Sequence, residues 1–127
     1  MVKKTQFWGE NEDDDRLVVQ ILEGRKTATC TPKMWWRPED RHPLGTLLAV
    51  HDLRDRYRCT IRINEVYETR FGDVDERVIR GECCRDREHF EAEHLRAWAA
   101  PMAREGVTLD ADTPIVVEHF ELVPDPT

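Results

Sequence analysis

The sequence predicts an α+β fold, in which helices cover a mostly antiparallel sheet. Residues 57–63 alternate apolar and polar side chains with a period of two, which is typical of a strand with one buried face. Residues 87–102 instead carry bulky side chains at the i, i+4 spacing of a helix. No internal repeat or interior linker divides the 127 residues, so we expect a single domain over residues 1–127.

The first expected element is a helix over residues 12–23. The acidic run at residues 10–15 suits the positive N-terminal end of a helix dipole. Gly24 is typical of a helix C-cap. Apolar side chains at i, i+4 spacing give the helix one stripe: Leu17 with Ile21, and Val18 with Leu22.

A long loop and a β-hairpin are expected next. Residues 32–43 hold three prolines and two tryptophans, and a loop of this length in a small domain is often functional. The apolar run at 47–50 predicts a buried strand, residues 52–55 predict a turn, and residues 56–64 complete the hairpin. The polar face of the hairpin carries three arginines, Arg56, Arg58 and Arg62. They form either a phosphate-binding stripe or a solvated charged face, and the net negative charge of the chain favours the solvated face.

The C-terminal half is expected to add two helices. A short helical stretch follows residues 71–74 and ends near Arg80, and a longer helix covers residues 87–102, where Pro101 bends or ends it. His94 lies on the apolar stripe of this helix, so it is interpreted as a hydrogen-bonded core histidine rather than a ligand or base. The stripe consists of Phe90, His94 and Trp98.

A last strand over residues 115–123 closes the domain, and residues 124–127 are expected to form a loose tail. Short strands with one apolar face can wrap around a core. We therefore expect a small closed β-barrel of mostly antiparallel strands flanked by two or three helices.

The charge and hydropathy of the chain argue against several functions. With 19 Lys and Arg against 26 Asp and Glu, the formal net charge is −7, so non-specific binding of DNA or another long polyanion is not expected. The sequence contains no run of about 18 apolar residues, so a membrane-spanning helix is not predicted. The N-terminus shows no apolar signal segment. We therefore expect a cytoplasmic monomer or homodimer without a membrane partner.

The cysteines do not predict a metal site. Without a secretory signal, the four thiols are expected to be reduced. Cys83 and Cys84 are adjacent, which fits neither a Cys-x-x-Cys zinc site nor an unstrained disulfide. Although His89 and His94 follow, the cysteine pair is interpreted as packing at a loop-to-helix junction. Neither a metal nor a cofactor is predicted.

Several short motifs occur in an order that resembles the ASCH domain family, whose members have a PUA-like β-barrel. The segment Gly24-Arg25-Lys26-Thr27-Ala28-Thr29 resembles the signature of that family. The resemblance spans roughly the whole chain, and the ordered set is more specific than any one piece. The other pieces are Phe7-Trp8-Gly9, Pro43-Leu44-Gly45 before residues 47–50, Phe71 with Val74, the Phe90, His94 and Trp98 stripe, and Phe120-Glu121-Leu122-Val123.

The resemblance implies a pocket beside the barrel that holds a nucleotide or a modified base. Some ASCH proteins are amidohydrolases that remove the acetyl group from acetylcytidine, and others are linked to RNA cleavage or RNA binding. By resemblance to the amidohydrolases, the catalytic residues fall on Lys26, Thr29 and Glu82. The sequence around Glu82 departs from the family, which usually reads Ala-x-x-Glu-Gly where this chain has Ile79-Arg80-Gly81-Glu82-Cys83.

Amide hydrolysis needs a nucleophile, a proton shuttle and a donor for the oxyanion. Thr29 offers a hydroxyl, provided that a bend brings it toward Lys26. Lys26 acts as a base if burial or the neighbouring Arg25 lowers its pKa, and otherwise its ammonium group binds an oxyanion or phosphate. Glu82 activates water or protonates the leaving amine if a dry pocket raises its pKa. In the structural alternative, Thr29 starts a strand, Lys26 pairs with an acid, and Glu82 caps the helix near Asp86.

Substrate-binding residues are predicted around the signature and in the long loop. Tryptophan can stack on a base, and arginine can contact a phosphate. Of the two adjacent tryptophans, one is expected to face the pocket and the other to pin the loop to the barrel wall. The predicted binding residues are Arg25, Thr27, Trp35, Trp36 and Arg37.

Three functions remain open at this point. The favoured one is a hydrolase acting on an acylated cytosine nucleoside, because a net charge of −7 favours a small substrate over a long polyanion. The second is an RNA- or nucleotide-binding module, with ribonuclease activity as a variant, and the third is a sensor of a nucleotide-like ligand. Under the first, Lys26→Ala is expected to abolish turnover and leave the thermal melt nearly unchanged.

Overall fold

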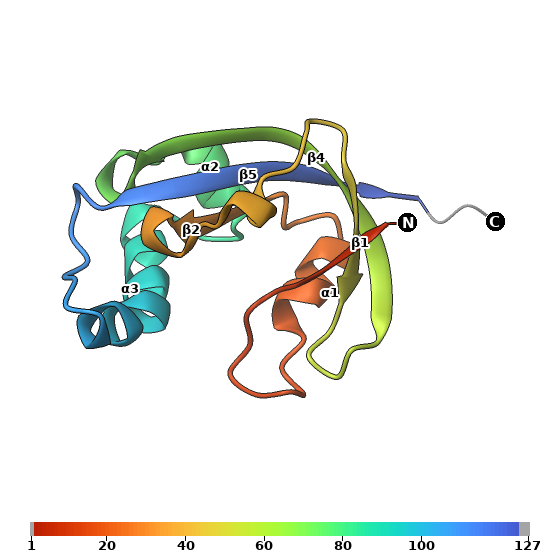
Figure 1. The fold of residues 1–127 in the computed structure, drawn as a ribbon, viewed down its shortest axis with the longest axis horizontal. Coiled ribbons are helices and arrows are strands. Elements are labelled where there is room, and N and C mark those ends of the chain that lie inside the picture. The colour runs from red at the N-terminus through yellow and green to blue at the C-terminus, as the bar shows by residue number, and fades with distance from the viewer. Residues whose placement is uncertain (1, 125–127) are drawn as a thin grey trace.

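The computed structural model describes residues 2–124 and contains a five-stranded sheet curled into a half-barrel (Figure 1). The strand order is β1-β3-β4-β5-β2, in which β1 is parallel to β3 and all other neighbours are antiparallel. The strands are β1 (Lys3–Gln6), β2 (Ala28–Pro32), β3 (Leu47–His51), β4 (Tyr57–Arg70) and β5 (Pro114–Val123). The helices are α1 (Arg16–Leu22), α2 (Glu76–Gly81) and α3 (Arg87–Arg104).

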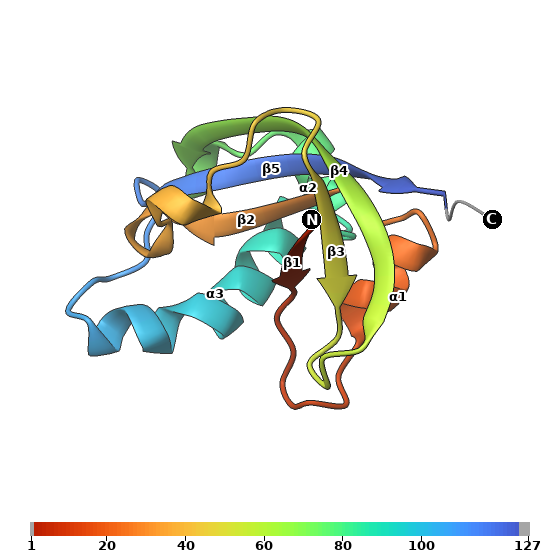
Figure 2. The same cartoon turned by 45° about the vertical axis from the view of Figure 1, so that its right-hand side comes forward.

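The α+β prediction with a mostly antiparallel, curled sheet and flanking helices is confirmed. The curl is open rather than closed, because the edge strands β1 and β2 are not paired with each other within residues 2–124. Figure 2 shows how β3 and the first half of β4 bend away from β5 and β2. This leaves the outer edge of β2 free for the site described below.

Two apolar clusters cover the two faces of the sheet. On one face, α2 and α3 pack against β2 and β5 through a cluster that includes Phe90, Trp98 and Val117. On the other face, inside the curl, α1 packs against β3, β4 and β5 through a cluster that includes Ile21 and Ile61. β2 therefore separates two differently lined spaces.

The N-terminal helix is shorter than its apolar pattern predicts. The helix begins at Arg16, and no acidic residue lies in its first turn. The acidic run instead forms turns, because the Asp14 carboxylate accepts from the Glu10 N–H and the Asn11 side chain accepts from the Asp13 N–H. Gly24 follows the helix with a φ of 76°, as expected of a C-cap glycine.

The sheet contains two strands more than the alternation predicts, and one strand is longer. β1 was not expected, and β2 realises the alternative in which Thr29 belongs to a strand. β4 continues through a register shift between Ile63 and Glu65. This shift interrupts the period of two, so the alternation did not predict the second half of β4. Pro101 does not end α3, which continues to Arg104.

The expected long loop contains two short 3-10 turns, and the expected short helix, α2, follows Phe71–Asp73. The expected loose tail falls mainly on residues 125–127, which lie outside the described residues. Among the helices of residues 2–124, none combines the length and the apolar character needed to cross a membrane.

Candidate active site

Lys26 is a buried lysine between α1 and β2. It is 2% exposed, and its backbone N–H is held by the Gln20 carbonyl. Its Nζ donates to the Ala28 carbonyl at 2.6 Å and to Glu82 Oε1 at 2.8 Å, and lies 5.7 Å from the centre of the Phe7 ring. The ammonium group therefore sits at the peptide group that joins Ala28 to Thr29.

Glu82 reaches Lys26 because the end of α2 packs directly on β2. A Cβ atom at Gly81 would lie 2.8 Å from the Ala28 Cβ and 2.9 Å from the Thr27 hydroxyl, so only glycine allows this approach without a shift. The Thr27 N–H also donates to the Gly81 carbonyl at 2.8 Å. The residue that follows, Glu82, is thereby fixed beside Lys26 rather than at the cap of α3, which is Asp86.

His94 completes a buried chain of three titratable groups. Its Nε2 lies 2.9 Å from Glu82 Oε2, and its Nδ1 lies 2.7 Å from the carbonyl of Phe90. Both ring nitrogens thus face oxygen acceptors, an arrangement that suits the imidazolium form. The expectation of a hydrogen-bonded histidine on the apolar stripe holds, but its main partner is the carboxylate of Glu82.

The pKa values follow from this pairing. Burial raises the pKa of Glu82, but Lys26 and His94 outweigh it and bring that pKa to about 2. For His94, burial lowers the pKa, while the hydrogen bond that its ring donates to Glu82 outweighs burial and raises the pKa above 6.5. The condition for Glu82 to protonate a leaving amine, a raised pKa, is therefore not met.

A cavity of about 630 Å³ opens beside this chain. This volume lies within the range of small-molecule sites, about 300–1,000 Å³. It follows the free edge of β2 between α1 and α3. Its lining is mainly apolar and aromatic, with Glu82 and His94 on one wall; the lining includes Phe7, Trp8, Leu17, Gln20, Thr29, Trp35, Glu82, His94 and Trp98.

Four of the predicted site residues meet around this space, since Glu82, Thr29 and Trp35 line it and Lys26 binds Glu82. Lys26 and Thr29 do not converge through a bend, because Thr29 is already in β2. The lysine side chain instead folds back to the peptide group before Thr29.

The other predicted binding residues lie elsewhere. Arg25 is exposed, pairs with Glu23 at 2.6 Å and lines a separate shallow hollow with Thr27. Trp36 lines a second hollow inside the half-barrel, so each of the two adjacent tryptophans faces a different cavity. Arg37 lines neither, and its backbone N–H donates to Asp40.

Burial of Lys26 changes the stability that we expect of its alanine variant. Lys26→Ala was expected to leave the thermal melt unchanged, but it would leave the Glu82 carboxylate buried with one cationic partner fewer. Such a change lowers the free energy of unfolding.

The cysteines are held as neutral thiols. Burial raises the pKa of Cys30 well above its ordinary value, and it raises the pKa of Cys84 to about 12. Cys83 and Cys84 lie in the connection between α2 and α3, as expected for packing at a loop-to-helix junction. Within residues 2–124, no group of three or more His, Cys, Asp or Glu side chains is placed to hold a metal ion.

Sequence reasoning missed three cavity residues. Gln20 lies on α1 near the stripe, and its Oε1 atom is buried with no hydrogen-bond partner within residues 2–124. Trp8 is half exposed over the cavity. Trp98 was assigned to the core but also lines the cavity. The i, i+4 spacing of His94 and Trp98 could have indicated Trp98, because one helix face can line both a core and a cavity.

Comparisons with known proteins agree with this fold. The crystal structure of an ASCH domain from Lactobacillus crispatus superimposes with a TM-score of 0.81 at 21% identity, covering 95% of this chain and 79% of that one. A protein of Enterococcus faecalis V583 gives a TM-score of 0.80 at 24% identity, covering 97% and 77%. No curated protein matches the sequence. The ASCH domain family model matches residues 4–124, and the chain therefore belongs to the ASCH domain family.

Proposed function

We propose that the protein is an amidohydrolase that removes the acyl group from an acylated cytosine nucleoside. The observation that carries this proposal is the buried chain Lys26–Glu82–His94 at the wall of a cavity that Thr29 also lines. A buried ion chain beside a hollow is a typical arrangement of a catalytic site.

The cavity suits a flat, partly polar ligand. Trp8, Trp35 and Trp98 line it, and aromatic side chains are good platforms for stacking a nucleobase. The unpartnered Gln20 Oε1 is an acceptor left over for a ligand N–H, since buried polar atoms are normally hydrogen-bonded.

The side chains have complementary roles in acyl transfer. The Thr29 hydroxyl attacks the acyl carbonyl. The Lys26 ammonium group has three N–H donors, of which two are used by Ala28 and Glu82, and the third stabilises the oxyanion that forms. Glu82 remains ionised and orients Lys26 and His94. The bond between the acyl carbon and N4 then breaks, and water hydrolyses the acyl-threonine.

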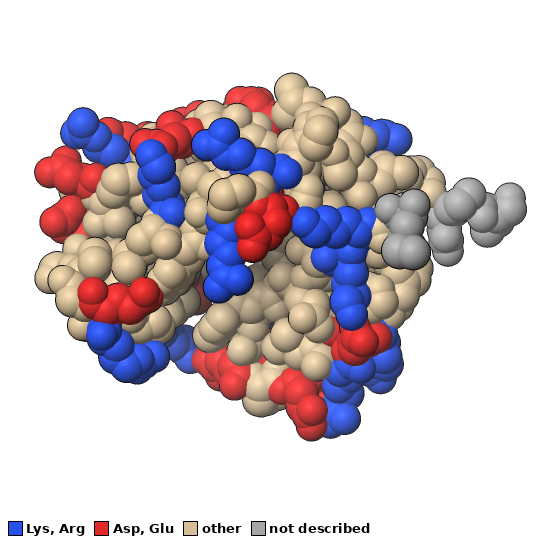
Figure 3. Space-filling view, viewed as in Figure 1, with Lys and Arg blue, Asp and Glu red and all other residues tan. Residues whose placement is uncertain are grey.

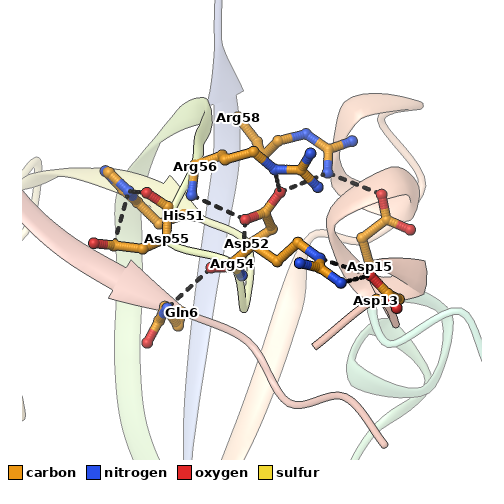
Figure 4. A network of polar contacts seen from close by, with 9 residues as sticks. All are labelled: Gln6, Asp13, Asp15, His51, Asp52, Arg54, Asp55, Arg56 and Arg58. Carbon is orange, nitrogen blue, oxygen red and sulfur yellow. Dashed lines mark hydrogen bonds and ion pairs between the residues drawn. The ribbon is translucent and has the colours of Figure 1, made fainter. Parts of the chain in front are cut away.

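An RNA-binding function has less support. The three arginines of the predicted hairpin face are each bound to a carboxylate: Arg56 and Arg58 to Asp52, Arg58 also to Asp15, and Arg62 to Glu121. Figure 4 shows the first part of this network around Asp52. Figure 3 shows acidic and basic side chains interspersed over one face of the molecule rather than gathered by sign. A phosphate chain requires clustered, free cations.

The test is release of cytidine from acetylcytidine and other acylated cytosine nucleosides, followed by chromatography at pH 7.5. The informative variant is Thr29→Val, which keeps the shape of the side chain and removes the hydroxyl. We expect wild-type turnover and a loss of at least 10²-fold in kcat for the variant, about the size of one lost catalytic group.

Thr31→Val is the matched control, because Thr31 lies two residues further along the same strand. It is expected to change KM at most. Absence of turnover by the wild type on every nucleoside would contradict the proposal. Equal turnover by Thr29→Val would contradict the role of the hydroxyl.

A further inference from the structure

A second hollow of about 300 Å³ lies inside the half-barrel, on the other side of β2 from His94. It shares Thr29 with the first cavity, together with Phe7 and Trp8. Its wall contains Glu118 of β5, a carboxylate that the proposed reaction has not used. Figure 2 shows β5 running beside β2.

Glu118 is the direct cross-strand neighbour of Thr29. The Phe120 N–H donates to the Thr27 carbonyl, so the alternation of the ladder makes Thr29 and Glu118 the next hydrogen-bonded pair. The Cα atoms of such a pair lie about 5.5 Å apart, and their side chains project from the same face of the sheet. The carboxylate and the hydroxyl therefore enter the same hollow from adjacent strands.

Glu82 lies on the opposite side of β2. Successive side chains of a strand alternate between its faces. Cys30, which follows Thr29, packs in the cluster with α2 and α3, and Glu82 helps to raise the pKa of its thiol. Both Glu82 oxygens are also engaged, one by Lys26 and the other by His94. By contrast, no hydrogen bond or ion pair within residues 2–124 reaches the carboxylate of Glu118.

We propose that Glu118 is the general base that takes the proton from the Thr29 hydroxyl, an inference that rests on the proposed function. As the Thr29 oxygen bonds to the acyl carbon, its proton moves to the Glu118 carboxylate. Glu118 then gives this proton to the leaving N4 nitrogen as the carbon–nitrogen bond breaks. In the second half, Glu118 takes a proton from the attacking water and returns it to the Thr29 oxygen as the carboxylic acid product leaves.

The surroundings of Glu118 suit this role. Burial, and to a smaller extent the nearby charge of Asp40, raises the pKa of Glu118 to about 7. A base is most effective when its pKa lies near the working pH. The other titratable groups that line the hollow are Asp40, His42, whose pKa is lowered by burial, and Cys30, whose thiol stays neutral. The strands β1, β3 and β4 contribute uncharged side chains to it: Thr5, Gln6, Leu48, Ile61 and Ile63.

The test compares pH–rate profiles of the wild type, Glu118→Gln and Glu121→Gln on acetylcytidine. Glu121 is the control, because it lies on the same strand, is exposed and pairs with Arg62. We expect wild-type kcat to rise through pH 7 to a plateau. In Glu118→Gln, kcat should fall by about 10²–10⁴-fold and the rise should vanish. Glu118→Asp should restore part of the rise. Unchanged kcat and profile in Glu118→Gln would overturn the inference while leaving the proposed function intact.

A second probe separates this inference from the proposed function. p-Nitrophenyl acetate is an activated ester that transfers an acetyl group to a nucleophile without requiring a nucleoside. Mass spectrometry of the peptide that contains Thr29 should show an acetyl adduct that forms faster through pH 7 and is reduced in Glu118→Gln. If acetylcytidine is not hydrolysed but this adduct forms and depends on Glu118, only the proposed substrate fails. An adduct that does not depend on Glu118, or none at Thr29, overturns the inference.

Discussion

Replacing Lys26 with methionine tests how much the buried ion pair stabilises the fold. The Lys26 side chain is 1% exposed and that of Glu82 is 9% exposed, with 2.8 Å between the charged atoms. Removing one partner of such a buried pair costs about 3–5 kcal/mol. His94 remains as a second partner of Glu82, so we expect the lower end of that range.

The expected shift of the melting temperature follows from the size of the domain. The entropy of unfolding near 60 °C is about 2.1 cal/mol/K per residue, so each kcal/mol lowers the melting temperature by about 4 °C in a domain of this length. A loss of about 3 kcal/mol therefore corresponds to roughly 10 °C. The assay is thermal unfolding at pH 7 followed by circular dichroism, with urea unfolding as a second measurement.

Lys33→Met is the matched control. Lys33 forms an ion pair of similar length with Glu68, 2.7 Å, but the two side chains are 54% and 52% exposed. An exposed pair contributes about 0–1 kcal/mol, so this variant should melt within a few degrees of the wild type. If Lys26→Met melts as close to the wild type as Lys33→Met does, the buried pair does not hold the site in the way described.

Three further predictions concern the same region. Glu82 has a pKa of about 2 in the folded state against 4.5 in the unfolded state, so the stability that it contributes is present above pH 4.5 and is lost as the pH falls toward 2. The free energy of unfolding of Glu82→Gln should therefore fall less steeply with pH over this range than that of the wild type, as acid unfolding would show. Glu118 has a pKa of about 7 in the folded state against 4.5 in the unfolded state, so the folded state binds the extra proton and loses stability as the pH rises between these values. In urea unfolding, Glu118→Gln should therefore gain more stability relative to the wild type at pH 8 than at pH 4.5. An equal effect of the substitution at both pH values would contradict the raised pKa. Gly81→Ala places a Cβ 2.8 Å from that of Ala28 and should cost about 1–3 kcal/mol in urea unfolding, whereas an unchanged midpoint would mean that α2 does not press on β2.

Much of the fold could be predicted because its periodic segments are strong. The alternation of Cys59, Ile61 and Ile63 gave the first half of β4, and the apolar spacing of Phe90 and Trp98 gave α3. β1 escaped because its four residues are mostly exposed and pair in parallel with a distant strand. The second half of β4 escaped because a bulge changes which residues face inward.

The site was harder to predict because its contacts are long-range. Lys26 and Glu82 are 56 residues apart, and the pair depends on the close packing of Gly81 on Ala28. The family resemblance named Lys26, Thr29 and Glu82, but it carried no information on His94 as their neighbour. Glu118 lies in β5, where most of the other residues are apolar, and only the register between β2 and β5 places it opposite Thr29.

The central claim is that the cavity at the edge of β2 binds an acylated nucleoside with its acyl group at Thr29. The most direct measurement is a crystal structure of Thr29→Val, which should bind but not turn over, grown with acetylcytidine. The account predicts a nucleoside in the cavity lined by Trp35 and Trp98, with the acyl carbonyl oxygen within hydrogen-bonding distance of Lys26 Nζ. An empty cavity at millimolar acetylcytidine, or a nucleoside bound with its acyl group away from Lys26, would contradict it.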